Sequence, residues 1–443
     1  MNRRAHLYAL IIFFFALLVR IVFLDSIPGN INPDAIDTLR TYIWDSSHAT
    51  LSPVGFNWNG ASAINTIIIG TSWKLFGESI FGLRLPSALF SSLSIAVVFY
   101  LGYMITKNLW LTFAFALATA TNSWFLNFSR SGWENVWNSL SVMLIALGLN
   151  FFISKRLYKA GSLLVGVGSL LGLYFYHPGK MLFPVAMLIL FVYSIAFKAN
   201  KLSAILYLFI TVFAVSILFI PQFISIVQNP ETATNRISTV SINNHYDVSP
   251  SEQIKRNLIG FSLFRPQDFN FGSWSRYISD QEYPIYPIIT LLYWLGIIVS
   301  LIKFPYLSVF YLLSILPVEL LSQHTPDAAR AVHIVPMIFL FALIGCSVLI
   351  DWLDKFLQSK STIWKLLPTA TATCFVIVVA FFQLSWYFSW IQKSQTLESR
   401  QPAIWLDEYD IWETDISYFI EKDKNYNIDE WRDIKNTNYG ISD

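Results

Sequence analysis

The sequence predicts an all-α, polytopic membrane protein. Of its 443 residues, 55% are hydrophobic and only 13% are charged, whereas a soluble domain carries about 25% charged residues. The apolar residues are gathered in long runs, and the mean hydropathy is +0.51. This composition excludes a soluble globular protein and a disordered one. The runs are also longer than the short alternating segments of a β-barrel.

The first apolar run, 7–24, follows Arg3 and Arg4. It resembles a signal peptide in this respect, but it is long and no small-residue cleavage site comes after it. We therefore predict an uncleaved first span. Its basic end is expected in the cytoplasm, because cytoplasmic flanks are enriched in Lys and Arg.

A membrane span needs about 20 apolar residues. The predicted bundle has about 11 transmembrane helices; after 7–24 they fall at 85–106, 109–127, 136–153, 161–176, 181–197, 202–220, 285–302, 305–321, 331–350 and 365–387. The run 62–76 is short and is interrupted by Asn65, Thr66, Gly70 and Lys74. We expect it to form a helix that lies in the membrane interface rather than a span.

The positive charges support this count. When 62–76 is not counted as a span, every loop predicted to face the cytoplasm contains Lys or Arg. These loops are the short connections at Lys107 and Lys303 and the segments 154–159, 198–201 and 351–365. The first outer loop (25–84), the long outer loop (221–284) and the tail (388–443) are then extracytoplasmic. The predicted organisation is a transmembrane module, 1–387, in the inner membrane, followed by a short tail with 12 Asp+Glu against 6 Lys+Arg over 393–443.

A candidate general base lies in the first outer loop. Asn32 suits a helix N-cap and Pro33 the first helical position, so Asp34 falls in the first turn and Asp37 one turn later on the same face. One interpretation is that Asp34 only complements the helix dipole. The other is that a carboxylate at the membrane surface, in a chain with few acids, removes a proton from a substrate.

Four cations are predicted at the same outer face, against the usual distribution: Arg84, Arg130, Lys180 and Arg330. Each alone has a structural explanation, since Arg130 could pair with Glu134 and Arg84 could only anchor a span. Together they favour an anionic ligand, and a phosphate head group suits Arg and Lys. Further polar candidates for binding substrate in these loops are Glu134, His177, His324 and Asp327.

Other classes of site are not indicated. Cys346 and Cys374 both lie in apolar runs and give no disulfide or zinc signal. No clustered basic face predicts a nucleic-acid partner. We name no metal ligand and no cofactor.

The order of these motifs resembles the GT-C membrane glycosyltransferases, in the branch similar to bacterial protein O-mannosyltransferases and to the aminoarabinose transferases of lipid A. The carrying segments are 32–34 (NPD), 127–134 (NFSRSGWE), 174–180 (YFYHPGK) and 329–336 (ARAVHIVP). The most specific segment is 76–88, FGESIFGLRLPSA. The resemblance covers roughly 7–350.

The resemblance implies a polyprenyl-phosphate-linked sugar donor, an inverting transfer on the outer side of the membrane, and juxtamembrane helices over a helical bundle. It places the catalytic base on Asp34. Many members have Asp-Glu there, whereas this chain has Ala35, so any role of that Glu is missing or shifts to Asp37. Relatives that bind a divalent metal use an acidic second outer loop, and here that loop has only Glu134, so metal dependence is not expected.

The implied acceptor is a hydroxyl of a protein, a lipid or a glycan, and membrane lipids are the other partners. A multi-span transporter is an alternative, but it predicts ionisable residues near mid-membrane and an inverted repeat. A lipid-carrier flippase is a further alternative. Loss of transfer on substitution of Asp34, with lipid binding retained, fits only the enzyme.

Overall fold

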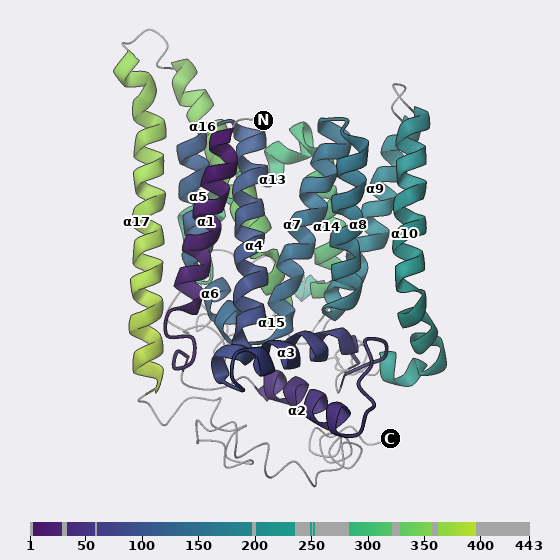
Figure 1. Ribbon diagram of the computed structural model, residues 1–443. Helices are drawn as coiled ribbons and strands as arrows, with labels where there is room; N and C mark the ends of the chain where they lie inside the picture. The colour runs from purple at the N-terminus through teal and green to yellow at the C-terminus, as the bar shows by residue number, and fades with distance from the viewer. Residues whose placement is uncertain are drawn as a thin grey trace.

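The computed structural model describes residues 3–28, 33–57, 60–196, 201–234, 249, 251–252, 283–320, 328–356 and 362–395. Over these residues the regular secondary structure is helical, apart from one isolated β-bridge between Phe56 and Ser62. The helices that run along the bundle in Figure 1 are α1 (Arg3–Ile21), α4 (Ile80–Thr106), α5 (Leu109–Thr121), α7 (Asn138–Leu149), α8 (Tyr158–Tyr174), α9 (Leu182–Ala196), α10 (Lys201–Gln228), α13 (Pro287–Lys303), α14 (Pro305–Leu320), α16 (Val335–Phe356) and α17 (Thr362–Gln395).

Each predicted span coincides with one of these helices. By length and composition, seven helices of the described chain can cross a membrane, or eight when the bent pair α5 and α6 (Ser123–Arg130) is taken as one span. The shorter apolar helices α13 and α14 lie within the same bundle (Figure 1). The prediction of an all-α polytopic membrane protein is therefore confirmed.

The predicted span 109–127 is not straight. It bends by 55° between Thr121 and Ser123. The bend occurs because the Asn122 side chain caps α6, accepting a hydrogen bond from Phe125 N at 3.1 Å. The Asn122 amide also donates to Pro284 O at 2.8 Å. The helix beyond the bend continues to Arg130, so the predicted outer loop at 128–135 is shorter than expected.

Two helices lie across one end of the bundle instead of along it (Figure 1): α2 (Pro33–Ser47) and α3 (Ala63–Leu75). This is the arrangement expected for 62–76 as an interfacial helix. The two pack closely, because the Tyr42 ring lies against Gly70, where any side chain would collide with it. The Asn65 amide donates to Phe175 O, so α3 is also fixed to the segment after α8.

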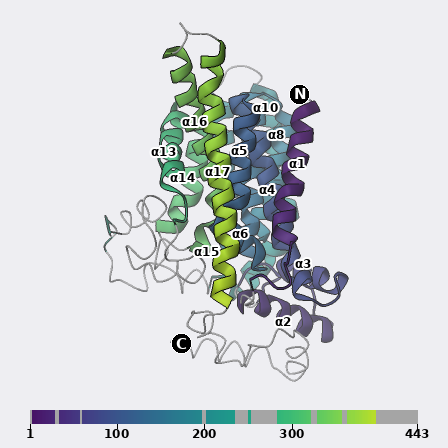
Figure 2. The same ribbon diagram turned by 90° about the vertical axis from the view of Figure 1, so that its left-hand side faces the viewer.

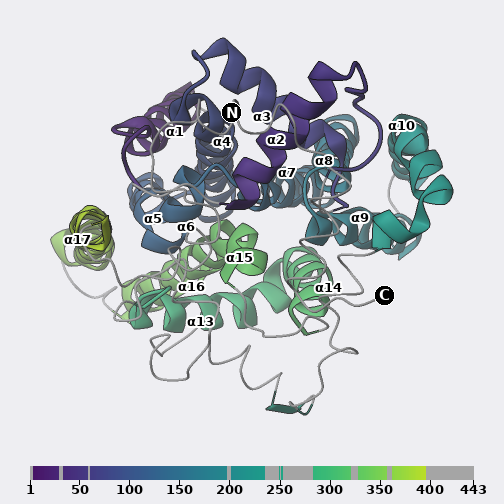
Figure 3. The ribbon, with the colours of Figure 1, turned by 90° about the horizontal axis from the view of Figure 1, so that it is seen from below.

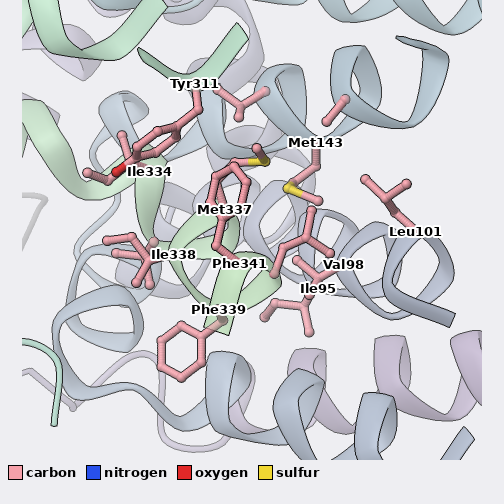
Figure 4. Close-up of a cluster of buried hydrophobic side chains, with 14 of the residues drawn as sticks. Ile95, Val98, Leu101, Met143, Tyr311, Ile334, Met337, Ile338, Phe339 and Phe341 are labelled. Carbon is pink, nitrogen blue, oxygen red and sulfur yellow. The ribbon is translucent and has the colours of Figure 1, made fainter. Parts of the chain in front are cut away.

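The bundle core lies where α4, α7, α14 and α16 meet (Figure 4). Its side chains are large, apolar and fully or almost fully buried; they include Ile95, Val98, Leu101, Met143, Tyr311, Met337, Ile338 and Phe341. Glycines bring α13 and α16 into backbone contact, since a Cβ on Gly296 would lie 1.7 Å from Phe341 O. This closely packed core joins the helices whose ends carry the candidate site.

The helices at the edge present apolar side chains outward. α17 stands at one edge of the bundle (Figure 2), and α10 stands at another (Figure 3). On α10, Phe209 is 67% exposed, and on α17, Phe381 is 66% exposed. Such surfaces suit a lipid environment, where apolar side chains need no protein partner.

The helix ends divide the predicted loops between two sides. α1 begins at the end of the bundle opposite α2 and α3, and the connections after α4 and before α8, with Lys107 and Lys155, lie at that opposite end (Figure 1). This division matches the predicted topology. That the basic side is cytoplasmic stays a prediction, and most of the long outer loop and of the tail lies outside the described residues.

Candidate functional site

Asp34 lies in the first turn of α2 and is half-buried. Its backbone carbonyl accepts a hydrogen bond from the Thr38 hydroxyl at 3.0 Å, as in a regular helix start. Seen from below, α2 crosses the end of the bundle (Figure 3). The predicted cap Asn32 and the side chain of Asp37 lie outside the described residues.

Ala35, next to Asp34, is fully buried against the loop that follows α6. A Cβ placed on Gly132 would lie 3.5 Å from Ala35 Cβ and 3.4 Å from Arg84 Cγ. Gly132 has φ +82°, which a glycine adopts without strain. A Glu at position 35 would have to displace these neighbours, so the departure from the Asp-Glu pattern fits the local packing.

Arg130 ends α6 and is fully buried. Its guanidinium donates hydrogen bonds to the carbonyl oxygens of Val19, Arg20, Val22, Phe23 and Ile27, at 2.7 to 3.2 Å. The predicted role of Arg130 as a phosphate ligand stays a prediction, and the partners that the structure gives its guanidinium are all backbone carbonyls. The carbonyls at the end of a helix have no intrahelical partner, and Arg130 supplies the donors.

Arg84 is also fully buried. Its Nη1 donates to Leu24 O at 2.9 Å, and Asp25 lies close enough to interact with it electrostatically. The guanidinium thus reaches the same segment that Arg130 holds. Of the two interpretations of Arg84, the structure favours the anchor over the phosphate ligand.

Glu134 opens the short helix η1 (Glu134–Trp137) and is fully buried. The backbone before it is fixed by Ser87, whose hydroxyl donates to Trp133 O at 3.0 Å and accepts from Trp137 Nε1 at 2.8 Å. Both contacts come from the motif at 76–88. That motif therefore positions the Glu134 segment.

His177 and Lys180 lie in the short helix η3 (His177–Met181), and both are half-buried. The Lys180 ammonium lies 3.3 Å from His177 Nδ1. Asn138 Nδ2 donates to Tyr176 O at 3.1 Å, and the Trp133 and Tyr176 rings are 6.4 Å apart. These contacts place Tyr176, which directly precedes the helix of Lys180, against the segment that follows Gly132.

Arg330 lies in α15 (Ala328–Ala331) and is half-buried. Two side chains of the Arg130 region hold this helix: Trp124 Nε1 donates to Ala328 O at 3.0 Å, and Asn135 Nδ2 donates to Ala329 O at 2.8 Å. α14 contacts both η3 and α15. The remaining candidates, His324 and Asp327, lie outside the described residues.

Two buried polar residues were not predicted. Arg20 is fully buried, and its guanidinium donates to Ser91 Oγ, Ala16 O and Ala120 O at 3.0 to 3.1 Å. His333 is 1% exposed in the segment after α15. For Arg20, the signal in the sequence is its position inside the apolar run 7–24, because a cation there must be buried with hydrogen-bond acceptors.

No group of three or more His, Cys, Asp or Glu side chains among the described residues could hold a metal ion. The candidate acids that the structure describes at this end of the bundle, Asp34 and Glu134, stand on separate short elements. The described residues thus include one half-buried carboxylate, Asp34, and two half-buried cations, Lys180 and Arg330. The short helices of the two cations, η3 and α15, both contact α14.

No family profile and no curated protein matches the chain. Among solved structures, it is similar to the crystal structure of ArnT from Cupriavidus metallidurans bound to undecaprenyl phosphate. The TM-score is 0.48 and the identity 11%, over 90% of this chain and 73% of that chain. So distant a likeness assigns no role to any single residue of this chain.

Proposed function

We propose that this membrane protein is a glycosyltransferase. It moves a sugar from a polyprenyl-phosphate-linked donor to an acceptor hydroxyl at the extracytoplasmic membrane face, with inversion. The observation that carries the proposal is the position of Asp34, half-buried at the start of a helix that lies across the end of the bundle. The sequence resemblance gives that residue the role of the base.

The chemistry requires one carboxylate. Asp34 accepts the proton of the acceptor hydroxyl while the hydroxyl oxygen forms a bond to the anomeric carbon. The bond from that carbon to the phosphate oxygen breaks, and polyprenyl phosphate leaves with the electron pair. A phosphate is already a good leaving group, so no second carboxyl acting as general acid is needed, unlike in a glycoside hydrolase.

Lys180 and Arg330 are the proposed phosphate-binding cations. Both are half-buried, and α14 contacts both of their helices. A phosphate suits the ammonium as a point charge and the guanidinium as a fork of donors. The charge on phosphate is present before and during transfer, so these residues contribute to donor binding and to turnover alike.

The acceptor is a protein, a lipid or a glycan hydroxyl, and the residues favour none of the three. The donor can be identified more directly, because we expect its lipid to remain bound to the protein during purification. Mass spectrometry of lipids that co-purify with the chain should identify a polyprenyl phosphate carrying a sugar. Finding only bulk phospholipids would count against a donor site.

The decisive experiment is Asp34→Asn, which keeps size and polarity but removes basicity. Membranes with either form are given polyprenyl-phosphate-linked mannose and aminoarabinose as probes, and release of free polyprenyl phosphate is measured. We expect transfer to fall about 10²–10⁴-fold, the usual contribution of a general base, with donor binding nearly unchanged. Movement of intact donor between leaflets, unaffected by Asp34→Asn, would instead identify a flippase.

A further inference from the structure

We propose that Arg130 is a positioning residue that fixes Asp34 by holding the last turn of α1 and the turn that follows it. The inference rests on the proposed function for its kinetic consequence, but not for its structural one. In place of the role of phosphate ligand, it gives Arg130 the role that the hydrogen-bond partners of its guanidinium define. These partners lie within 19–27, far from Arg130 in sequence.

The Arg130 side chain holds residues 19–27. Its Nη1 binds the carbonyls of Val19 and Arg20, in the last turn of α1, at 2.7 and 2.8 Å. Its Nη2 binds Val22, Phe23 and Ile27, in the turn after α1, at 2.7, 3.2 and 3.0 Å. One rigid planar group thus fixes both the end of α1 and the turn after it.

A second point of approach lies two residues further along the same loop. A methyl added at Gly132 would make van der Waals contact with the methyl of Ala35, the neighbour of Asp34, at 3.5 Å. Arg84 lies at both places, because its Cγ would be 3.4 Å from that methyl and its Nη1 donates to Leu24 O at 2.9 Å. Residues 130–132 therefore meet the chain at Ile27 and beside Ala35, which directly follows Asp34.

A third helix packs against Arg130. The Tyr387 side chain of α17 is fully buried and lies close enough to the Arg130 side chain to interact with it electrostatically. The Tyr387 hydroxyl lies 3.4 Å from Asn127 Oδ1, and the Phe388 ring centre lies 5.4 Å from Arg130 Cζ. α17 packs mainly on α5, and these contacts link it to Arg130 as well.

Only arginine meets these requirements. Guanidinium carries five N–H donors in a fixed plane, whereas a lysine ammonium carries three donors on a single atom. A lysine at position 130 keeps the charge but cannot reach Val19 and Ile27 together. The buried carbonyls that the guanidinium now binds then lose a donor, and an unpaired buried carbonyl is costly.

The test compares Arg130→Lys with Arg20→Lys. The two arginines are equally buried, but the Arg20 side chain binds Ser91, Ala16 and Ala120 rather than the turn. We expect Arg130→Lys to lower kcat at least about tenfold, because small misplacements of reacting groups cost one to two orders of magnitude, with donor affinity kept within about twofold. Arg20→Lys should leave kcat nearly unchanged at a temperature where both variants are folded. Equal loss in both would overturn the proposal.

A spectroscopic measurement does not depend on activity. Ser26 is exposed in the turn, and a nitroxide on Ser26→Cys, with Cys374 replaced by Ser, reports its mobility. We expect a more mobile spectrum in Arg130→Lys and an unchanged one in Arg20→Lys. An unchanged spectrum in Arg130→Lys contradicts the positioning role. If wild-type protein shows no transfer at all, the proposed function fails while this measurement still decides the role of Arg130.

A milder variant covers the case in which Arg130→Lys does not fold. Tyr387→Phe removes one buried hydroxyl from Arg130, and Tyr293→Phe removes one from the Tyr293–Tyr311 hydrogen bond of 2.8 Å, distant in sequence from α2. We expect only Tyr387→Phe to increase nitroxide mobility and to lower kcat without changing donor affinity. Identical behaviour of the two would overturn the link through α17.

Discussion

Two regions at one end of the bundle carry cations that differ in burial and in their hydrogen-bond partners. In the first, which we call the anchor region, Arg84 and Arg130 are fully buried and bind backbone carbonyls of 19–27. In the second, which holds the proposed phosphate ligands and which we call the ligand region, Lys180 and Arg330 are half-buried on short helices. The difference shows that a cation near a membrane surface is not by itself a ligand site. Its burial and its existing acceptors decide what it can bind.

The largest effect should come from the anchor region. Arg130→Ala removes all five hydrogen bonds. Phe23 O keeps a donor in Ile27 N at 2.8 Å, but the buried carbonyls of Val19, Arg20 and Ile27 lose the guanidinium, at a cost of about 1–3 kcal/mol each. We expect the protein to lose more than about 3 kcal/mol of stability, measured as a lower Tm in detergent, with poor expression. A Tm equal to that of wild type would place Arg130 with the ligand region and break the comparison.

The ligand region should show the converse. Lys180→Ala and Arg330→Ala should each weaken donor binding by about tenfold, the order of one charge-assisted hydrogen bond to phosphate, while Tm changes little. Binding of polyprenyl phosphate to purified protein, measured by native mass spectrometry or by thermal shift, is the assay. Lys180→Arg serves as the control and should retain binding. A lower Tm with unchanged binding of polyprenyl phosphate in both alanine variants would show that Lys180 and Arg330 are structural residues.

The smallest effect is expected where the anchor region meets α2. Gly132→Ala adds a methyl at φ +82°, a left-handed conformation that costs a non-glycine residue roughly 1–2 kcal/mol. It also meets Arg84 Cγ at 3.4 Å and Ala35 Cβ at 3.5 Å. We expect a Tm lowered by a few degrees and a modest loss of transfer. Gly77→Ala, where φ is +85° but nothing lies within 4 Å, is the matched control for strain alone.

The overall fold could be predicted because membrane spans leave a strong signal in composition. Each of the predicted apolar runs became a helix of the bundle, and the polar residues of 62–76 correctly marked a helix that lies across its end. Asn65 shows why the signal was informative, since its amide is used on Phe175 O rather than left in lipid. The bend at Asn122 was missed because no proline or glycine marks it, although the polar stretch 119–123 contains a good N-cap residue.

The roles of the cations could not be predicted in the same way. Arg130 and Lys180 both follow or precede a span in a short polar loop, so the sequence suggests a phosphate ligand for both. The acceptors of Arg130 are backbone carbonyls more than 100 residues away, and a carbonyl has no signature in the sequence. The partners of Arg20 are hidden for the same reason. The placement of Asp34 at the start of a helix was predictable, because its capping pattern is local.

The contact between α17 and Arg130 also has a consequence for biogenesis. Helices are inserted in the order in which the ribosome makes them, and Tyr387 emerges more than 250 residues after Arg130. Until then the Arg130 side chain lacks the Phe388 ring that covers it in the finished fold. The carbonyls of 19–27 that bind the guanidinium are made long before it. We therefore expect the guanidinium to be bound by the backbone first and covered by α17 last.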